Sequence, residues 1–97
     1  MTSMNPVRDN EMYYVYVIKS LVSDYLYTGV TNDLRKRFSQ HQKGVGGWSK
    51  RHRPYELIYY EACRNLADAM AREKYLKTGM GKRYLKNRLK RFLSLTG

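Results

Sequence analysis

The segment from Met12 to Ile18 (MYYVYVI) constrains the fold of this chain more than any other part of the sequence. Every position is apolar or aromatic, and residues that are β-branched or aromatic favour a strand over a helix. A strand with one solvated face would alternate polar and apolar residues, and this segment does not alternate. We therefore expect a strand that is covered on both faces of its sheet.

The signals that follow are typical of one small α/β domain. A short polar connection over 20–24 joins the first strand to a second one over 25–30, so the two make a β-hairpin. The remaining elements are expected to be a helix over 34–43, a strand over 55–61, a helix over 65–77 and a helix over 82–95. This β-β-α-β-α-α order predicts a small three-stranded antiparallel or mixed sheet flanked by helices. Residues 1–11 are expected to form a flexible polar tail, and 12–97 the single domain.

Capping residues set the expected ends of the helices. Residues 31–33 (TND) supply N-cap side chains for the first helix, and glycines within 44–47 end it. Asn65 opens the second helix. Gly79 and Gly81 are expected to break that helix before the last one begins.

The charge balance of the chain points to a polyanionic partner. Nineteen Lys and Arg residues stand against eight Asp and Glu residues, so the formal net charge is +11 at pH 7. Eight of these cations, and no acidic residue, lie from Lys74 to the C-terminus. A membrane surface would attract the same charge, but stable anchoring also needs a large apolar moment or a lipid. We therefore expect a nucleic-acid partner, DNA in the first place, with RNA not excluded.

Two segments are candidates for contact with a phosphate backbone. The glycine-rich segment from Gly44 to Pro54 carries Trp48 and several cations, which suit a backbone or a splayed base, although an ordinary mobile surface loop has the same composition. In the last helix an apolar stripe of Leu85, Leu89 and Phe92 turns the cations outward. The candidate nucleic-acid-binding residues are Lys50, Arg51, Arg53, Lys82, Lys86, Lys90 and Arg91.

Cysteine usage and hydropathy exclude several other classes of protein. The single cysteine, Cys63, cannot form an intramolecular disulfide, and no Cys and His residues are spaced to hold zinc. The N-terminal segment lacks the apolar core of a signal peptide, and no stretch approaches the roughly 20 apolar residues of a membrane span. We expect a cytoplasmic protein that does not contact a membrane and acts as a monomer.

The first predicted helix places two polar side chains beside the core. Leu34, Arg37, Phe38 and His41 share one face, because spacings of three, four and seven residues return to the same side of a helix. Leu34 and Phe38 must face the core, so Arg37 and His41 lie next to it. A guanidinium held there can bind a phosphate through two parallel hydrogen bonds. The alternative is that Arg37 extends along the surface to solvent and His41 only packs.

The second predicted helix carries an acid where apolar residues are expected. Glu73 falls inside the arc formed by Leu66, Ala69, Met70 and Leu76. A carboxylate there needs a cation, hydrogen-bond donors or a metal ion. A structural salt bridge, for example with Arg37, and a metal site are both open.

Tyr16 and Tyr27 complete the set of candidate residues. The hairpin is expected to place them roughly opposite each other, so that both hydroxyls reach one site. With ten tyrosines in the chain, packing in the core is the competing interpretation of both.

The order and spacing of these residues resemble the GIY-YIG nuclease domain over roughly residues 12–92. The matching positions are the segment Tyr14–Tyr16, the segment Tyr27–Gly29, which begins eleven residues after Tyr16, and then Arg37, His41 and the helical Glu73. The runs YYVYVIKS, YTGVTNDLRKRFSQH and AREKYLKTG are especially similar to small bacterial proteins that consist of this domain alone. The chain departs from the first motif at Tyr14 and Val15, in place of Gly and Ile, and from the second motif at Thr28, in place of Ile.

The resemblance implies a hydrolase of DNA phosphodiesters that uses one divalent cation, Mg²⁺ or Mn²⁺, held by Glu73. It implies catalytic roles for Tyr16, Tyr27, Arg37, His41 and Glu73. The family also tends to carry a late Asn near the site, but Asn87 lies opposite the apolar stripe of its helix and is not assigned that role.

We therefore expect a metal-dependent endonuclease that selects DNA by its structure, in repair or recombination. The main alternative is a basic nucleic-acid-binding module without catalysis, and a weaker one is docking on an acidic partner. The pairing of Glu73 with Arg37 on inward helix faces favours the enzyme, because a carboxylate repels phosphate and brings nothing to a simple binder.

Overall fold

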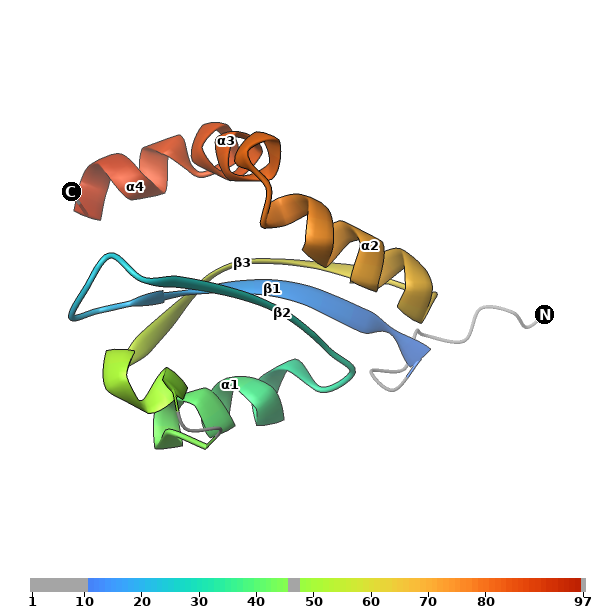
Figure 1. Ribbon diagram of the computed structural model, residues 1–97, viewed down its shortest axis with the longest axis horizontal. Coiled ribbons are helices and arrows are strands. Elements are labelled where there is room, and N and C mark those ends of the chain that lie inside the picture. Colours follow the sequence, from blue (N-terminus) through green and yellow to red (C-terminus); the bar gives the residue numbers. More distant parts are fainter. Residues whose placement is uncertain (1–10, 46–47, 97) are drawn as a thin grey trace.

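A three-stranded antiparallel sheet divides the protein into two layers. The computed structural model describes residues 11–45 and 48–96. Strand β1 (Tyr13–Ser20) lies between β2 (Leu26–Thr31) and β3 (Tyr55–Cys63) and pairs with both. One face of the sheet carries α1 (Leu34–Lys43) and the 3₁₀ helix η2 (Trp48–His52) (Figure 1). The other face carries α2 (Leu66–Leu76), α3 (Gly79–Arg88) and α4 (Lys90–Thr96). The predicted α/β class is confirmed, and the sheet is antiparallel.

The sequence of β1 separates two cores, one on each side of the sheet. Val15 and Val17 pack with Ala69, Leu76 and Leu85 of the α2–α3 layer. Tyr16 and Ile18 point to the α1 side, where they pack with Tyr55 and, less deeply buried, with Leu34 and Phe38. All four residues from Val15 to Ile18 are buried, as predicted for a strand covered on both faces. Alternate residues of a strand point to opposite faces, so one strand supplies both cores.

Capping residues fix both ends of α1 and the start of α2. Asp33 accepts a hydrogen bond from the backbone amide of Lys36, and Gly44 ends α1 in the left-handed conformation, at a φ of 79°. Asn65 caps α2 by accepting from the amide of Asp68. The predicted caps and the end of α1 at Gly44 are therefore confirmed. Gly46 and Gly47 lie outside the described residues, as does the predicted tail except for Glu11.

The end of α2 at Leu76, with Lys77 as its C-cap, lies within one residue of the prediction, but the predicted role of Gly79 and Gly81 and the single last helix are wrong. Gly79 begins α3, after Thr78 caps it by accepting from the amide of Gly81. Gly81 lies inside α3, and a side chain there would overlap the backbone of Tyr75 and Leu76, so this glycine permits the close approach of two helices. The predicted helix over 82–95 is split at Leu89 into α3 and α4. Leu85 is buried and Leu89 packs beside it, but Phe92 belongs to the separate helix α4.

The predicted mobile basic segment is partly ordered against the hairpin. Ser20 Oγ donates a hydrogen bond to the carbonyl oxygen of His52, and the His52 ring stacks on Tyr25 with centroids 4.2 Å apart. Ser23 Oγ lies 3.1 Å from His52 Nδ1. These contacts hold η2 against the β1–β2 turn.

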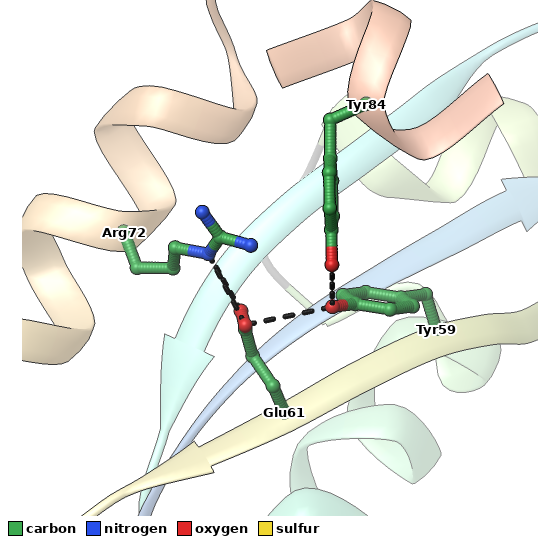
Figure 2. Close-up of polar contacts among 4 residues, drawn as sticks. All are labelled: Tyr59, Glu61, Arg72 and Tyr84. Carbon is green, nitrogen blue, oxygen red and sulfur yellow. Dashed lines mark hydrogen bonds and ion pairs between the residues drawn. The ribbon is translucent and has the colours of Figure 1, made fainter. Parts of the chain in front are cut away.

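A polar cluster of Tyr59, Glu61, Arg72 and Tyr84 joins β3 to α2 and α3 (Figure 2). Arg72 Nε donates to both carboxylate oxygens of Glu61, at 2.7 and 3.1 Å. The guanidinium carbon lies 4.8 Å from the centre of the Tyr84 ring. The Tyr59 and Tyr84 hydroxyls are 3.2 Å apart, and burial and the Tyr84 hydrogen bond raise the pKa of Tyr59 to about 12. The Tyr59 phenol therefore stays protonated at neutral pH and acts as a neutral hydrogen-bonding group.

We predict that Arg72→Met lowers the free energy of unfolding by about 1 to 2 kcal/mol, because Glu61 loses its hydrogen-bonded cation in a partly buried place. Lys77→Met is the matched control, since it removes the more exposed helical pair of Lys77 with Glu73 and should cost less than about 0.5 kcal/mol. Urea unfolding of the two variants and the wild type measures both effects. Equal losses in the two variants would contradict a stabilising role for the Glu61 pair.

Candidate functional site

A buried hydrogen bond between Tyr16 and His41 lies at the centre of the α1 side. The Tyr16 hydroxyl and His41 Nε2 are 2.9 Å apart, and they join the middle strand to α1. His41 is 1% exposed and Tyr16 is fully buried. Gln42, the next residue of α1, exchanges two hydrogen bonds with the backbone of Tyr55, at 2.6 and 2.8 Å. The side chain of Gln42 thus fixes the helix that carries His41 against β3.

Tyr27 lies beside this pair on the same face of the sheet. Tyr27 pairs with Ile18 in the hairpin, and Tyr16 pairs with Gly29. The two tyrosines are therefore diagonal neighbours rather than directly opposite, which corrects the expected pairing. The ring of Tyr27 has its centroid 6.0 Å from that of Tyr16 and 4.7 Å from that of His41. The hairpin thus brings the two phenol rings together with the imidazole.

Gly29 provides the space that the Tyr16 hydroxyl occupies. A Cβ atom at position 29 would lie 2.7 Å from the Tyr16 hydroxyl oxygen and 2.8 Å from a ring carbon of Tyr27. The positive-φ glycine of the described chain is Gly44, so Gly29 is required for its small size and not for its backbone conformation.

Arg37 brings a permanent positive charge to the two phenols. Its side chain is half-buried, and its Nη1 donates to the side-chain oxygen of Gln40 at 3.0 Å. Burial lowers the pKa of Arg37, and hydrogen bonds with the Tyr27 and Tyr16 hydroxyls raise it. The net shift of the pKa is upward. The first helix therefore places Arg37 and His41 beside the core, as its sequence predicts.

Burial keeps both partners of the central hydrogen bond neutral. Desolvation, and after it the nearby Tyr27, raise the pKa of Tyr16 well above its usual range. Desolvation and the charge of Arg37 lower the pKa of His41 to about 4. Nδ1 of His41 is buried and has no hydrogen-bond partner within the described part of the chain. At neutral pH the pair is therefore a protonated phenol and an uncharged imidazole.

Glu73 lies in the other layer, on the opposite face of the sheet from α1 (Figure 1). Its carboxylate pairs with Lys77 Nζ at 2.9 Å, and its side chain is 25% exposed. Arg37 is not its partner in any ion pair between the residues that the structure describes. The predicted apolar arc is also too wide, because Leu66 and Met70 are 44% and 54% exposed. Glu73 therefore lies at the margin of the buried face and is not enclosed by it.

A groove of about 370 Å³ lies between β2 and the helices α2 and α3. Tyr27 and Thr28 line it from the sheet, and Leu76 and Lys77 line it from α2. Lys82 and Leu85 of α3 close its far side. Lys77 is the partner of Glu73, so the groove places that ion pair and Tyr27 at the same edge of the sheet.

The predicted basic residues are exposed and belong to two separate surfaces. One surface, on the α1 side, contains Lys50, Arg51 and Arg53; the other, on α3 and α4, contains Lys82, Lys86, Lys90 and Arg91. Arg53 also donates from Nη1 to the carbonyl oxygen of Lys43, at the end of α1. The Trp48 side chain lies outside the described residues. Asn87 is exposed on α3.

Two contributions to this site were missed in the sequence. The Glu73–Lys77 ion pair has the i, i+4 spacing of a helical salt bridge, which is a readable signal. The role of Gly29 as a spacer depends on which residue pairs with Tyr16, and no sequence signal identifies that partner.

Two kinds of feature are absent from the described residues, a cluster of metal-ligating side chains and a membrane-spanning helix. Within residues 11–45 and 48–96 no three His, Cys, Asp or Glu side chains gather as they would in a metal site built from protein ligands alone. None of the described helices combines the length and apolar character needed to cross a membrane.

Comparison with known proteins identifies the family. Residues 12–90 match the family model described as the GIY-YIG catalytic domain. The chain belongs to the GIY-YIG family. A UPF0213 protein of Clostridium perfringens is 43% identical over 67 residues, which cover 68% of this chain and 71% of the relative. A UPF0213 protein of Pediococcus pentosaceus is 36% identical over 85 residues, which cover 87% and 88%.

A related chain has a solution NMR structure. It is the UPF0213 protein BH0048 from Bacillus halodurans, which is 29% identical, with 78% of this chain and 83% of that one covered and a TM-score of 0.49. The GIY-YIG match places the chain in a nuclease family and implies a nucleic-acid substrate.

We predict that His41 makes the stability of this GIY-YIG domain depend on pH. The pKa of His41 is about 4 in the folded protein and about 6.5 in an unfolded chain. Between these values only the unfolded chain binds the proton, so stability falls as the pH is lowered. From about pH 7 to about pH 4 the wild type should lose roughly 3 kcal/mol more than His41→Gln in urea unfolding. Parallel pH profiles for the two proteins would show that His41 is not the group responsible.

We also predict that Gly29→Ala displaces the rings of Tyr16 and Tyr27 and lowers the free energy of unfolding by about 1 to 3 kcal/mol. Gly79→Ala is the control, because a Cβ atom there meets nothing within 4 Å and should be neutral or slightly stabilising. Thermal melting gives the stabilities, and near-ultraviolet circular dichroism reports the tyrosine environment. An unchanged spectrum and melting temperature for Gly29→Ala would refute the spacer role.

Proposed function

We propose that this protein is an endonuclease that hydrolyses DNA phosphodiester bonds with the help of one divalent cation. The observation that supports it most is the buried Tyr16–His41 hydrogen bond with the Arg37 guanidinium beside it. A buried neutral phenol and imidazole provide a path for a proton, and a fixed cation beside them provides a partner for a phosphate. The net charge of +11 favours a polyanionic substrate.

Arg37 is the residue that binds the scissile phosphate in this proposal. Its hydrogen bonds to two phenols hold the guanidinium in place before the substrate arrives. As the water attacks, negative charge grows on the non-bridging oxygens, and a preorganised cation stabilises that charge more than it stabilises the ground state.

Tyr16 and His41 move the proton of the attacking water. Burial makes a free tyrosinate costly, so Tyr16 does not wait in the deprotonated form. Instead, once substrate binding has brought the water to this buried hydroxyl, its oxygen accepts a proton from the water while its own proton passes to Nε2 of His41, 2.9 Å away. The depressed pKa of His41 keeps its imidazole neutral at neutral pH, and in the tautomer with the proton on Nδ1 the Nε2 atom accepts this proton. Tyr27 borders the same groove and is the alternative proton acceptor.

Glu73 is the proposed ligand of the cation, Mg²⁺ or Mn²⁺. The donor set fits such an ion, because Mg²⁺ is commonly held by one or two carboxylates, substrate phosphates and waters. The partly exposed Glu73 carboxylate could exchange Lys77 for an ion at the rim of the groove. When bound, the cation would neutralise charge on the phosphate and on the leaving oxygen.

The alternative function is a basic nucleic-acid-binding module without catalysis. The Glu73–Lys77 ion pair favours it, because this carboxylate already has a cation partner without a metal ion. In either case the exposed cations bind phosphates rather than base edges, so we infer that substrates are selected by shape. Branched or nicked DNA of repair and recombination would be such a substrate. We infer a cytoplasmic location and a monomeric state as well.

The experiment compares cleavage of labelled branched, duplex and single-stranded DNA in Mg²⁺, in Mn²⁺ and in a chelator. We expect metal-dependent cutting by the wild type and a loss of at least about 100-fold in Arg37→Ala and Glu73→Gln. Metal-free Glu73→Gln should melt nearly as the wild type does, because only a partly exposed pair is lost.

Lys77→Gln separates the two roles of Glu73. If Glu73 only pairs with Lys77, Glu73→Gln and Lys77→Gln affect cleavage equally. If Glu73 holds the cation, the Lys77→Gln variant still binds the metal and still cuts DNA in a metal-dependent way. The Glu73→Gln variant then loses both metal binding and cleavage. Full cleavage by Glu73→Gln would overturn the metal assignment, and binding without cutting by the wild type under all conditions would favour the module.

A further inference from the structure

A second cleft lies on the α1 side of the sheet, beyond Tyr16. It has a volume of about 230 Å³ and is lined by Tyr14, Tyr60, Asn32, Asp33, Leu34 and Arg35. The cleft is therefore bounded by two strands and by the start of α1, and it is smaller than the roughly 300 to 1,000 Å³ typical of drug-sized ligand pockets. A single planar group suits it better than a larger ligand.

Two tyrosines form the aromatic wall of the cleft. The Tyr14 and Tyr60 rings meet edge to face, with centroids 6.1 Å apart and an interplanar angle of 62°. Tyr60 is 54% exposed, which is high for a large aromatic side chain at the wall of a cleft. A folded core gains nothing from this exposure, whereas a planar ligand can stack on the ring.

The register of the sheet places the cleft next to the candidate active site. Tyr60 pairs with Tyr16 across β1 and β3, so both side chains are on the α1 face. Tyr14 is two residues from Tyr16 on the same strand, which is about 7 Å. A strand of nucleic acid with a phosphate at Arg37 would thus have a neighbouring base within reach of the cleft.

The polar residues of the cleft fit a base joined to a phosphate backbone. Arg35 is exposed at the cleft and offers a charge to an adjoining phosphate. Asn32 offers an amide donor and acceptor at the rim. Asp33 is already engaged as the cap of α1, and its carboxylate accepts from the amide of Lys36. The cleft thus combines an aromatic stacking surface, an amide and a cation.

We propose that Tyr14 and Tyr60 form a stacking cleft for one unpaired nucleobase next to the phosphate that Arg37 binds. The proposal rests on the proposed function, because it takes Arg37 as the phosphate-binding residue. A base inside a duplex is stacked on its neighbours and cannot enter the cleft without being unstacked. The cleft therefore favours single-stranded nucleic acid, or a duplex that is frayed or branched at this position. Stacking is tolerant of base identity, so the cleft adds a preference for single-stranded over double-stranded nucleic acid and none for sequence.

Fluorescence of 2-aminopurine tests the stacking directly. Short single-stranded DNA with one 2-aminopurine, and its duplex, are titrated with the full-length protein in a chelator, so that binding is read without cleavage. We expect quenching with the single strand and an affinity for it that falls about 5- to 100-fold in Tyr60→Leu, which matches the usual effect of losing one base–aromatic stack. Duplex affinity should be unchanged in Tyr60→Leu.

Tyr60→Phe and Tyr14→Leu are the companion variants. Tyr60→Phe keeps the ring and should bind single strands as the wild type does, whereas Tyr14→Leu should reproduce the loss seen in Tyr60→Leu. Wild-type single-strand affinity in Tyr60→Leu, or an equal loss for single strand and duplex, would overturn the proposal. So would a dimer in sedimentation that Tyr60→Leu abolishes, because the cleft would then be an interface between two copies.

The result is distinguishable from a failure of the proposed function. If no DNA is cut but the quenching and the Tyr60→Leu loss remain, the enzyme proposal fails and the stacking cleft stands. If DNA is cut in the presence of metal but Tyr60→Leu binds single strands normally, the cleft proposal fails and the enzyme stands. Single-stranded RNA of the same sequence, run in parallel, tells which backbone the protein accepts.

Discussion

The burial of β1 on both faces is the constraint on which the rest of the structure depends. Val15 and Val17 bind the α2–α3 layer to the sheet, and Tyr16 and Ile18 bind α1. Because these four residues are consecutive, a register change of one residue would exchange the two cores. The strand therefore positions the polar site and the structural layer at the same time, and neither can shift without the other.

The candidate site on the α1 side depends on close contacts between residues of different elements. Gly29 leaves room for the Tyr16 hydroxyl, and that hydroxyl reaches His41 across the layer. Burial sets the proton affinities of both partners, and the charge of Arg37 acts in the same direction on His41. The polar cluster of Glu61, Arg72, Tyr59 and Tyr84 lies on the opposite face and has a different environment, since it connects secondary-structure elements and borders no groove of the site.

Features that depend on local sequence were predicted well. The face of α1 that carries Arg37 and His41 follows from helical periodicity, and the caps Asp33 and Asn65 follow from side-chain chemistry. Features that depend on tertiary contacts were predicted less well. Gly81 is a point of helix contact and not a helix break, and only the approach of Tyr75 reveals this. An ion pair of Glu73 with Arg37 was one of the two alternatives, but the sheet lies between their helices. One-dimensional periodicity does not specify which side of a sheet a helix covers.

The position of β2 at the edge of the sheet has a further consequence. Arg37 belongs to one layer and Glu73 to the other, and β2 is the strand whose groove both Tyr27 and Lys77 line. A molecule that touches both Arg37 and Glu73 along β2 passes around this edge. It then links α1 to α2 through contacts that the free protein lacks. Such a molecule binds only when both helices are docked, so its binding free energy adds to the stability of both cores. The two layers pack independently in the free protein. Binding of such a molecule would couple their stabilities.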